Sequence, residues 1–181
     1  METLRMRLRP FTETDASYFK ELDSDPAVMT WLTAGVPSTD EQVKASSERV
    51  LAIQAKHHGR FGIWLAFTKA TQEFMGWFLF RPDKADPENT QVIELGYRLK
   101  QKFWRQGYAT EGSAHFLRLG FNDYQVREIF AITMLGNVGS QSVMKKIGMS
   151  FVAHYTEKEF PGEDKRAVRY AIANWNLNPR D

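Results

Sequence analysis

The sequence of 181 residues contains no cysteine, which excludes disulfide bridges, thiolate metal ligands and a cysteine nucleophile within this chain. It also lacks an apolar run approaching the roughly 18 residues needed to cross a bilayer. The opening METLRMRLRP alternates apolar side chains with arginines, so it does not form the apolar core of a secretory signal. We therefore expect a cytoplasmic protein that uses no acyl-cysteine chemistry and binds no membrane.

A strong net charge is also missing, because 24 Lys and Arg nearly balance 22 Asp and Glu. The resulting +2 gives no field that would recruit nucleic acid, and no nucleic-acid motif is present. The four histidines show no convincing zinc-ligand spacing, so we expect no metal. The length and a hydrophobic content of 43% fit a single domain over residues 1–181 with a sizeable core.

The periodicity of apolar residues predicts a mixed α/β domain around one central sheet. Thr12 or Thr14 caps the first helix, and Ser38 with Glu41 forms a capping box before the second. Gly96, inside a strand, predicts a bulge at which the sheet opens. The expected strands cover residues 3–9, 61–67, 74–80, 92–100, 127–135, 149–159 and 167–175, and the helices cover 15–22, 38–57, 107–124 and 140–147.

The most informative stretch is FWRQGYATE at residues 103–111, which lies between a strand and a helix. The start of a helix offers unpaired N–H groups and a partial positive charge, which suit a pyrophosphate. Gly107 permits close backbone approach, Ala109 keeps the first turn clear, and Arg105 adds a guanidinium. The GxxxxGK[ST] and GxGxxG patterns are absent. Taken alone, one glycine and one alanine favour a simple tight turn.

Three blocks, in order and at fitting spacing, extend the match over nearly the whole chain. ELGYRL at residues 94–99 precedes WRQGYATEG at 104–112, and NVGS at 137–140 leads to KKIGM at 145–149. With LRMRLRPFTETDA at the N-terminus, these blocks resemble the Rim-type ribosomal-protein N-terminal acetyltransferases of the GNAT superfamily. That branch commonly has glycine after the tryptophan, whereas this chain has Arg105, a departure that bears on the phosphate contacts.

The resemblance implies a mostly antiparallel sheet, flanked by about four helices and splayed at a parallel pair formed by residues 92–100 and 127–135. Acetyl-CoA would place its pantetheine in the gap and its pyrophosphate on the loop before the helix. Lys145 and Lys146 would reach the 3'-phosphate, although paired lysines more commonly lie on a solvated helix face. The implied cofactor-binding residues are Tyr97, Leu99, Arg105, Gln106, Gly107, Tyr108, Ala109, Thr110, Asn137, Ser140 and Lys145.

Acetyl transfer to an amine needs a group that removes the amine proton and a proton donor for the leaving thiolate. The resemblance makes Ser140 the acid, although its position also suits a helix cap. Asn137 either binds the pantetheine or ends a strand in a turn. Glu94 is our first base, because burial in an apolar strand would poise its carboxylate; an outward-facing, solvated Glu94 is the alternative. Glu159, followed by Glu157, is the second choice.

Aromatic side chains supply candidates for the wall of the acceptor pocket, namely Trp31, Trp77 and Tyr155, although core packing explains most aromatics more simply. The Rim-type pattern favours a protein N-terminal amine as acceptor. A small-molecule amine (polyamine, amino acid analogue or antibiotic) and a non-catalytic acetyl-CoA-binding module are the alternatives. The sequence leaves monomer and homodimer both open.

Overall fold

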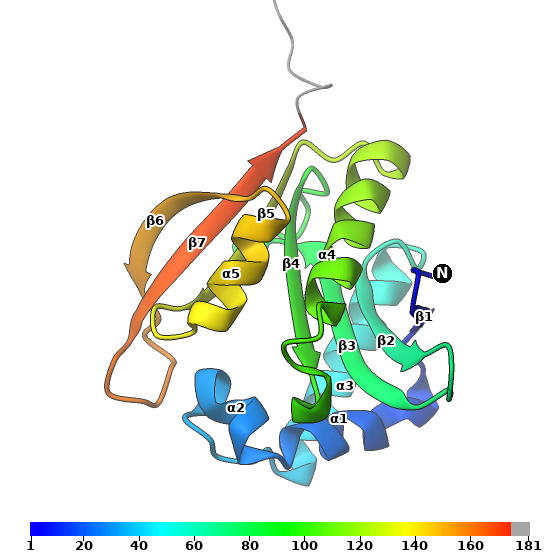
Figure 1. Ribbon diagram of the computed structural model, residues 1–181, viewed down its shortest axis with the longest axis vertical. Coiled ribbons are helices and arrows are strands. Elements are labelled where there is room, and N and C mark those ends of the chain that lie inside the picture. The colour runs from blue at the N-terminus through cyan, green and yellow to red at the C-terminus, as the bar shows by residue number, and fades with distance from the viewer. Residues whose placement is uncertain (175–181) are drawn as a thin grey trace, which may run out of the picture.

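The structure, a computed structural model, describes residues 1–174. These residues form one seven-stranded sheet with the order β1-β2-β3-β4-β5-β7-β6 and five α-helices (Figure 1). None of these helices is long and apolar enough to span a bilayer. The strands are β1 (Met6–Pro10), β2 (Gly62–Thr68), β3 (Phe74–Pro82), β4 (Val92–Leu99), β5 (Glu128–Met134), β6 (Ser150–Thr156) and β7 (Arg166–Ala173), and the helices are α1 (Ala16–Asp23), α2 (Pro26–Thr33), α3 (Asp40–Lys56), α4 (Tyr108–Arg118) and α5 (Val138–Lys146).

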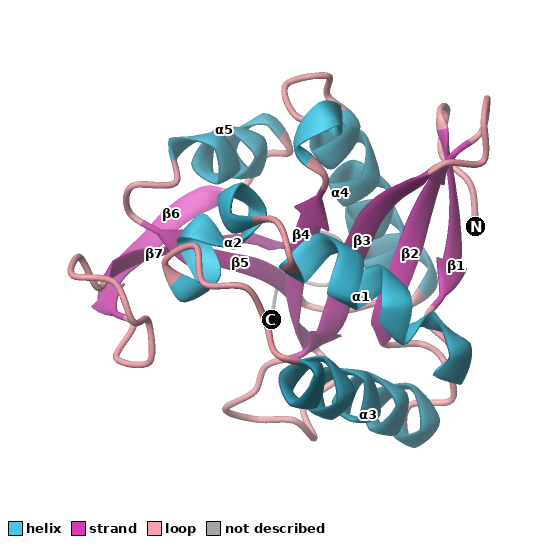
Figure 2. Ribbon diagram, turned by 90° about the horizontal axis from the view of Figure 1, so that it is seen from below, coloured by secondary structure: helices cyan, strands magenta, loops and turns pink. Residues whose placement is uncertain are grey.

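The sheet is covered on both faces, with α4 and α5 on one side and α1 and α3 on the other (Figure 2). Successive side chains of a strand point to opposite faces. In β3, Phe78 and Phe80 therefore pack toward Phe116 of α4, while Trp77 and Leu79 join the core under α1 and α3. The sheet separates two large apolar cores, and β2 and β3 contribute side chains to both.

All pairings are antiparallel except that of β4 with β5. This parallel pair extends over only three positions, Val92 with Glu128, Ile93 with Ile129 and Glu94 with Phe130. Beyond Glu94 the two strands diverge, while β4 stays paired with β3 and β5 with β7. The predicted antiparallel sheet with a splayed parallel pair is confirmed.

The helix α2 was not predicted, so five α-helices replace the expected four. The Asp25-Pro26 pair does end α1, but it also starts the next helix. The Asp25 carboxylate accepts a hydrogen bond from the backbone N–H of Ala27, and Pro26 occupies the first helical position, where its missing N–H costs nothing. Trp31, expected in a connection, therefore lies on a helix.

Two local predictions were wrong. Thr39 caps α3 and forms the capping box with Gln42, whereas the hydroxyl of Ser38 binds Asp23. No bulge occurs at Gly96: the β3–β4 register runs unbroken past it, and a Cβ there would make only ordinary 3.6 Å contact with Leu79. The sheet opens where the β4–β5 pairing stops after Glu94, without a bulge in β4.

Most other predicted boundaries hold to within about three residues, but α4 ends at Arg118 rather than residue 124. A π-helical turn, Leu119–Asp123, completes that segment. The β1 strand begins at Met6 rather than residue 3, and β6 ends at Thr156 rather than residue 159. The expected end of the last strand, Trp175, lies outside the described residues.

Gly112 sets how closely α4 approaches the sheet. A Cβ built at Gly112 would lie 2.1 Å from Cζ of the fully buried Phe78. We expect Gly112→Ala to destabilise the fold by about 1–3 kcal/mol through overpacking, although alanine favours a helix by about 1 kcal/mol. Gly139→Ala in α5 is the control, because its Cβ would meet only an ordinary 3.7 Å contact. Denaturant unfolding that shows equal effects for both variants would contradict this packing argument.

Candidate active site

The gap between β4 and β5 begins directly after Glu94 and Phe130. Residues 95–99 of β4 and 131–134 of β5 form no pairs with each other. Backbone N–H and C=O groups on facing strand edges need hydrogen-bond partners. The gap therefore suits an extended ligand that carries amide groups of its own, and α2 lies below the open ends of both strands (Figure 1).

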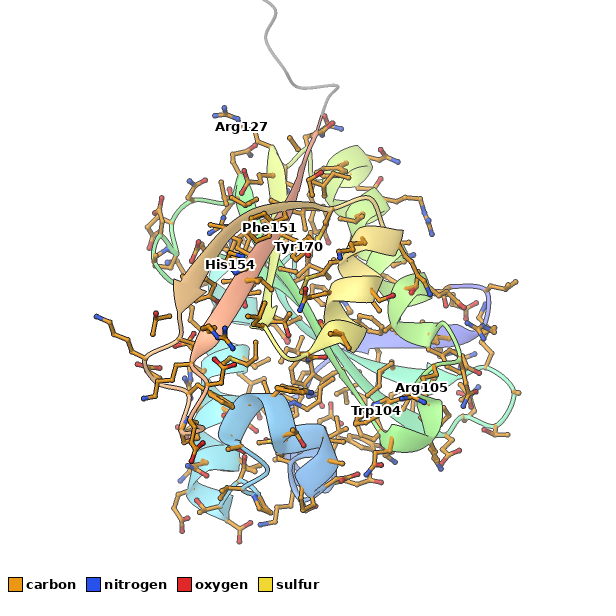
Figure 3. All side chains as sticks on the ribbon, turned by 60° about the vertical axis from the view of Figure 1, so that its left-hand side comes forward. Trp104, Arg105, Arg127, Phe151, His154 and Tyr170 are labelled. Atoms are coloured by element: carbon orange, nitrogen blue, oxygen red, sulfur yellow. The ribbon has the colours of Figure 1, made fainter. Side chains whose placement is uncertain are left out.

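The loop before α4 is shaped for an anion. Arg105 and Gly107 both have left-handed backbone conformations, with φ of 57° and 82°. Gly107 is the N-cap of α4 and provides no side-chain cap, so the first-turn N–H groups of this eleven-residue helix keep their positive end open. The indole N–H of Trp104 donates to the carbonyl of Leu99 at 2.7 Å and fastens the loop to the end of β4. Figure 3 shows Trp104 and Arg105 together on this loop.

Arg5 holds the same loop from the N-terminal segment. Its Nε lies 2.7 Å from Oε2 of Glu111, its Nη1 donates to the carbonyl of Gln106 at 3.0 Å, and its guanidinium stacks 4.0 Å above the ring of Tyr108. Glu111 also accepts from the hydroxyl of Thr3 and the backbone N–H of Arg5. Burial alone would raise the pKa of Glu111, but these hydrogen bonds outweigh it and hold that pKa below its ordinary value.

Three of the predicted residues meet on the α5 side of the gap. The side chain of Asn137, not Ser140, caps α5 by accepting from the backbone N–H of Ser140 at 3.1 Å. The Ser140 hydroxyl is thus free of capping, and it accepts a hydrogen bond from the hydroxyl of Tyr97 at 3.4 Å. Burial raises the pKa of Tyr97, so its proton stays in place at neutral pH.

Glu94 lies on the opposite face of β4. It is half-buried and paired with Arg81 at 2.5 Å. Burial, and then the charges of Glu157 and Glu94, raise the pKa of Tyr155 to about 12, and the buried Tyr155 hydroxyl has no hydrogen-bond partner among the described residues. Tyr155 therefore faces the same region as Glu94, while Glu159 is exposed in the turn after β6.

The remaining predicted residues are scattered. Trp31 is 41% exposed and its ring covers Gly136, where a Cβ would lie 2.6 Å from Cη2 of the indole. Trp77 packs near Phe19 of α1 and beneath the guanidinium of Arg98, in the core under α1 and α3.

The Leu99 side chain is in the opposite core, and its carbonyl already accepts the Trp104 indole. Lys145 lies exposed in the last turn of α5, 6.0 Å from the ring of Tyr170. No group of three His, Asp or Glu residues that could hold a metal occurs within residues 1–174.

Comparison with known proteins identifies the family. The profile described as "Acetyltransferase (GNAT) domain" matches residues 5–150. The FsC-acetyl coenzyme A-N(2)-transacetylase of Aspergillus fumigatus is 31% identical over 95% of this chain and 75% of its own length. The chain belongs to the GNAT acetyltransferases, a class of enzymes that use acetyl-CoA.

Solved structures agree with the fold. The ribosomal-protein-S5-alanine acetyltransferase of Vibrio fischeri superposes with a TM-score of 0.79 at 13% identity, covering 99% of this chain and 98% of that one. The spermidine N-acetyltransferase of Vibrio cholerae, solved with CoA and spermine, gives 0.75 at 12% identity, covering 93% and 95%. At these identities the structural similarity shows the fold alone. Proteins that share this fold include Rim-type acetyltransferases.

The residues that hold the site in place carry no local sequence signal. Arg5 and Glu111 are 106 positions apart, and Arg81 is 13 positions from Glu94 across a loop. The alternating arginines at the N-terminus indicate an exposed strand face. No local sequence feature, however, predicts that Arg5 pairs with a residue of α4. The pairing of Arg81 with Glu94 follows only from the β3–β4 register, which places the two residues opposite each other.

The charge of Glu111 should contribute stability that depends on pH. Because its pKa is lower in the folded chain than its ordinary value of 4.5, the contribution is complete above that value and is lost as pH falls through the folded pKa. We expect Glu111→Gln to cost about 1–3 kcal/mol at pH 7 and much less near pH 3. The exposed Glu48→Gln is the control in the same denaturant titrations. A cost for Glu111→Gln that is independent of pH would argue against the Arg5–Glu111 contact.

The left-handed backbone at Arg105 predicts how substitutions there change stability. A side chain in this conformation costs about 1 kcal/mol or more relative to glycine. Arg105→Gly should therefore be about 1 kcal/mol more stable than Arg105→Ala, while both lose the guanidinium. If that guanidinium binds phosphate, both variants should weaken acetyl-CoA binding to the same extent in calorimetry. Equal stability of the two variants would mean that the loop is not held in the observed conformation.

Proposed function

We propose that this protein transfers the acetyl group of acetyl-CoA to a primary amine by direct attack within a ternary complex. One observation carries the proposal: the β4–β5 gap is flanked by a helix start suited to an anion, after the end of β4, and by the Ser140–Tyr97 hydroxyl pair. An extended pantetheine would occupy the gap, and its pyrophosphate would bind the N–H groups after Gly107. Residues 1–181 would act as one catalytic domain.

Each reacting proton has a candidate group. Glu94 would take a proton from the amine, directly or through water, while the amine nitrogen bonds to the thioester carbon. An unpaired strand N–H at the gap would stabilise the oxyanion. As the C–S bond breaks, the Ser140 hydroxyl would protonate the leaving thiolate, and Tyr97, which donates to Ser140, would replace that proton. Glu159, exposed in its turn, is the alternative base.

The acceptor amine is proposed to lie on the Glu94 face, between α2 and β6, with Trp31 and Tyr155 as its walls. The Rim-type sequence pattern favours a protein N-terminal α-amine. A relative named as an acetyl coenzyme A-N(2)-transacetylase supports a nitrogen acceptor more generally. A non-catalytic module would need neither Glu94 nor the Ser140–Tyr97 pair.

Acetyl-CoA binding is the first test of this function. We expect Gly107→Glu to weaken binding at least about tenfold in calorimetry, because its carboxylate would repel the pyrophosphate. Gly59→Glu is a matched control, since Gly59 is exposed with a similar φ of 76° and open space around it. With acetyl-CoA bound, Ser140→Ala and Glu94→Gln should each lower kcat by about 10² or more in an amine screen. Failure of the unmodified chain to bind acetyl-CoA would overturn the proposal.

A further inference from the structure

A pocket lies on the Glu94 face of the sheet, between α3 and strands β3 and β4. Its volume is about 190 Å³, room for a small headgroup rather than a whole ligand of ordinary size. Four cations line it, Arg49 of α3, Arg81 of β3, Lys84 of the β3–β4 loop and Arg98 of β4. No acidic side chain lines it among the described residues. The wall of this pocket is therefore strongly positive.

Two of these cations already form ion pairs with carboxylates that do not line the pocket. Arg81 pairs with Glu94 and Arg98 with Asp23, and both arginine side chains are largely buried, with exposures of 12% and 16%. Arg49 and Lys84 are exposed and have no ion-pair partner among the described residues. An excess of two positive charges thus remains in the pocket lining, and it lies beside guanidinium groups in a partly desolvated setting, where Coulomb attraction is stronger than in water.

Unsatisfied hydrogen-bond donors accompany this charge. The indole N–H of Trp77 and the Nε–H groups of Arg81 and Arg98 are buried without any acceptor among the described residues. All three residues line the pocket. Buried donors without acceptors are uncommon in folded proteins and call for a ligand, a water or a small shift that brings an acceptor to them.

The pocket adjoins the proposed reaction centre. Arg81, which lines it, contacts the carboxylate of Glu94 directly. Along β4, Glu94, Gly96 and Arg98 share one face, because Leu95, Tyr97 and Leu99 belong to the core on the other. Gly96 places no side chain between Glu94 and Arg98, and a Cβ there would lie 3.6 Å from Leu79.

We infer that the acceptor is an amine that also carries a carboxylate, which this cationic pocket binds while the amine approaches Glu94. The inference rests on the proposed function and adds the chemical class of the acceptor. The carboxylate would accept hydrogen bonds from the guanidinium groups and face Arg49 and Lys84. A polyamine, by contrast, would be repelled by the same side chains.

Binding of the anion can be measured without turnover. We would titrate glutarate and its uncharged diamide into the acetyl-CoA-saturated protein at low ionic strength by calorimetry. We expect glutarate to bind and the diamide not to, and the double variant Arg49→Gln, Lys84→Gln to lose at least about tenfold in affinity.

The control for this titration is Arg118→Gln, Arg127→Gln, which removes the same charge from exposed positions; Arg127 lies at the opposite end of the molecule from α1 and α2 (Figure 3). Equal binding of glutarate and diamide, or an equal loss in the control, would overturn the inference.

Turnover then separates the two proposals. The acceptors are β-alanine and its amide, with Asp-Gly-Gly-amide and Asn-Gly-Gly-amide as the peptide arm. The carboxylate member of each pair should have the lower KM, and the Arg49→Gln, Lys84→Gln variant should raise that KM about tenfold while leaving the amide and acetyl-CoA values unchanged.

Three outcomes can be told apart. Glutarate binding without acetylation of any amine would refute the proposed function while retaining the anion site. Acetylation of amides as efficient as that of carboxylates would refute the inference while retaining the function. A preference confined to the peptide arm would identify an acidic N-terminal residue as the source of the carboxylate.

Discussion

The short parallel pairing of β4 with β5 is the constraint on which the rest of the arrangement depends. Three residue pairs join the two halves of the sheet, and the remaining length of both strands is paired only on the outer sides. If the pairing continued, the gap would close and Tyr97 would be shut off from α5. If it were absent, nothing would fix the distance between Tyr97 and Ser140, which lie 43 positions apart in the chain.

Charged contacts hold the groups around this gap in position. Arg5 ties the loop before α4 to Glu111 and to the carbonyl of Gln106, so contacts from the N-terminal segment add to those that the loop makes itself. On the other face, Asp23 at the end of α1 and Glu94 hold Arg98 and Arg81 against the sheet. Buried pairs of this kind contribute little net stability, but removal of one partner leaves an unpaired charge at considerable cost. They are better understood as fixing geometry.

Hydrophobic alternation, a local signal, predicted the strands of the sheet, and Gly107 marked the helix start, whereas the parallel pair was implied by the resemblance to the Rim-type acetyltransferases. The sequence did not predict α2, since Asp25-Pro26 reads equally well as a helix end and as a helix start. It offered a helix cap as the alternative role of Ser140, whereas Asn137 caps α5, because both residue types suit the position. Arg5, Arg81 and Arg98 were missed for a different reason: each acquires its partner only through tertiary register, which no single stretch of sequence contains.

The alternation of side chains along β4 bears directly on the chemistry. Glu94 points to the face covered by α1 and α3, whereas Tyr97, an odd number of residues away, points to the face covered by α4 and α5. A thioester lying in the gap between these faces would meet the proposed base from one side and the proposed acid from the other. An amine that attacks from the Glu94 side then expels the thiolate toward Ser140, so proton removal and proton delivery need not compete for one group. Successive side chains of a strand point to opposite faces of the sheet. A strand whose one edge is left unpaired is therefore sufficient to produce that separation.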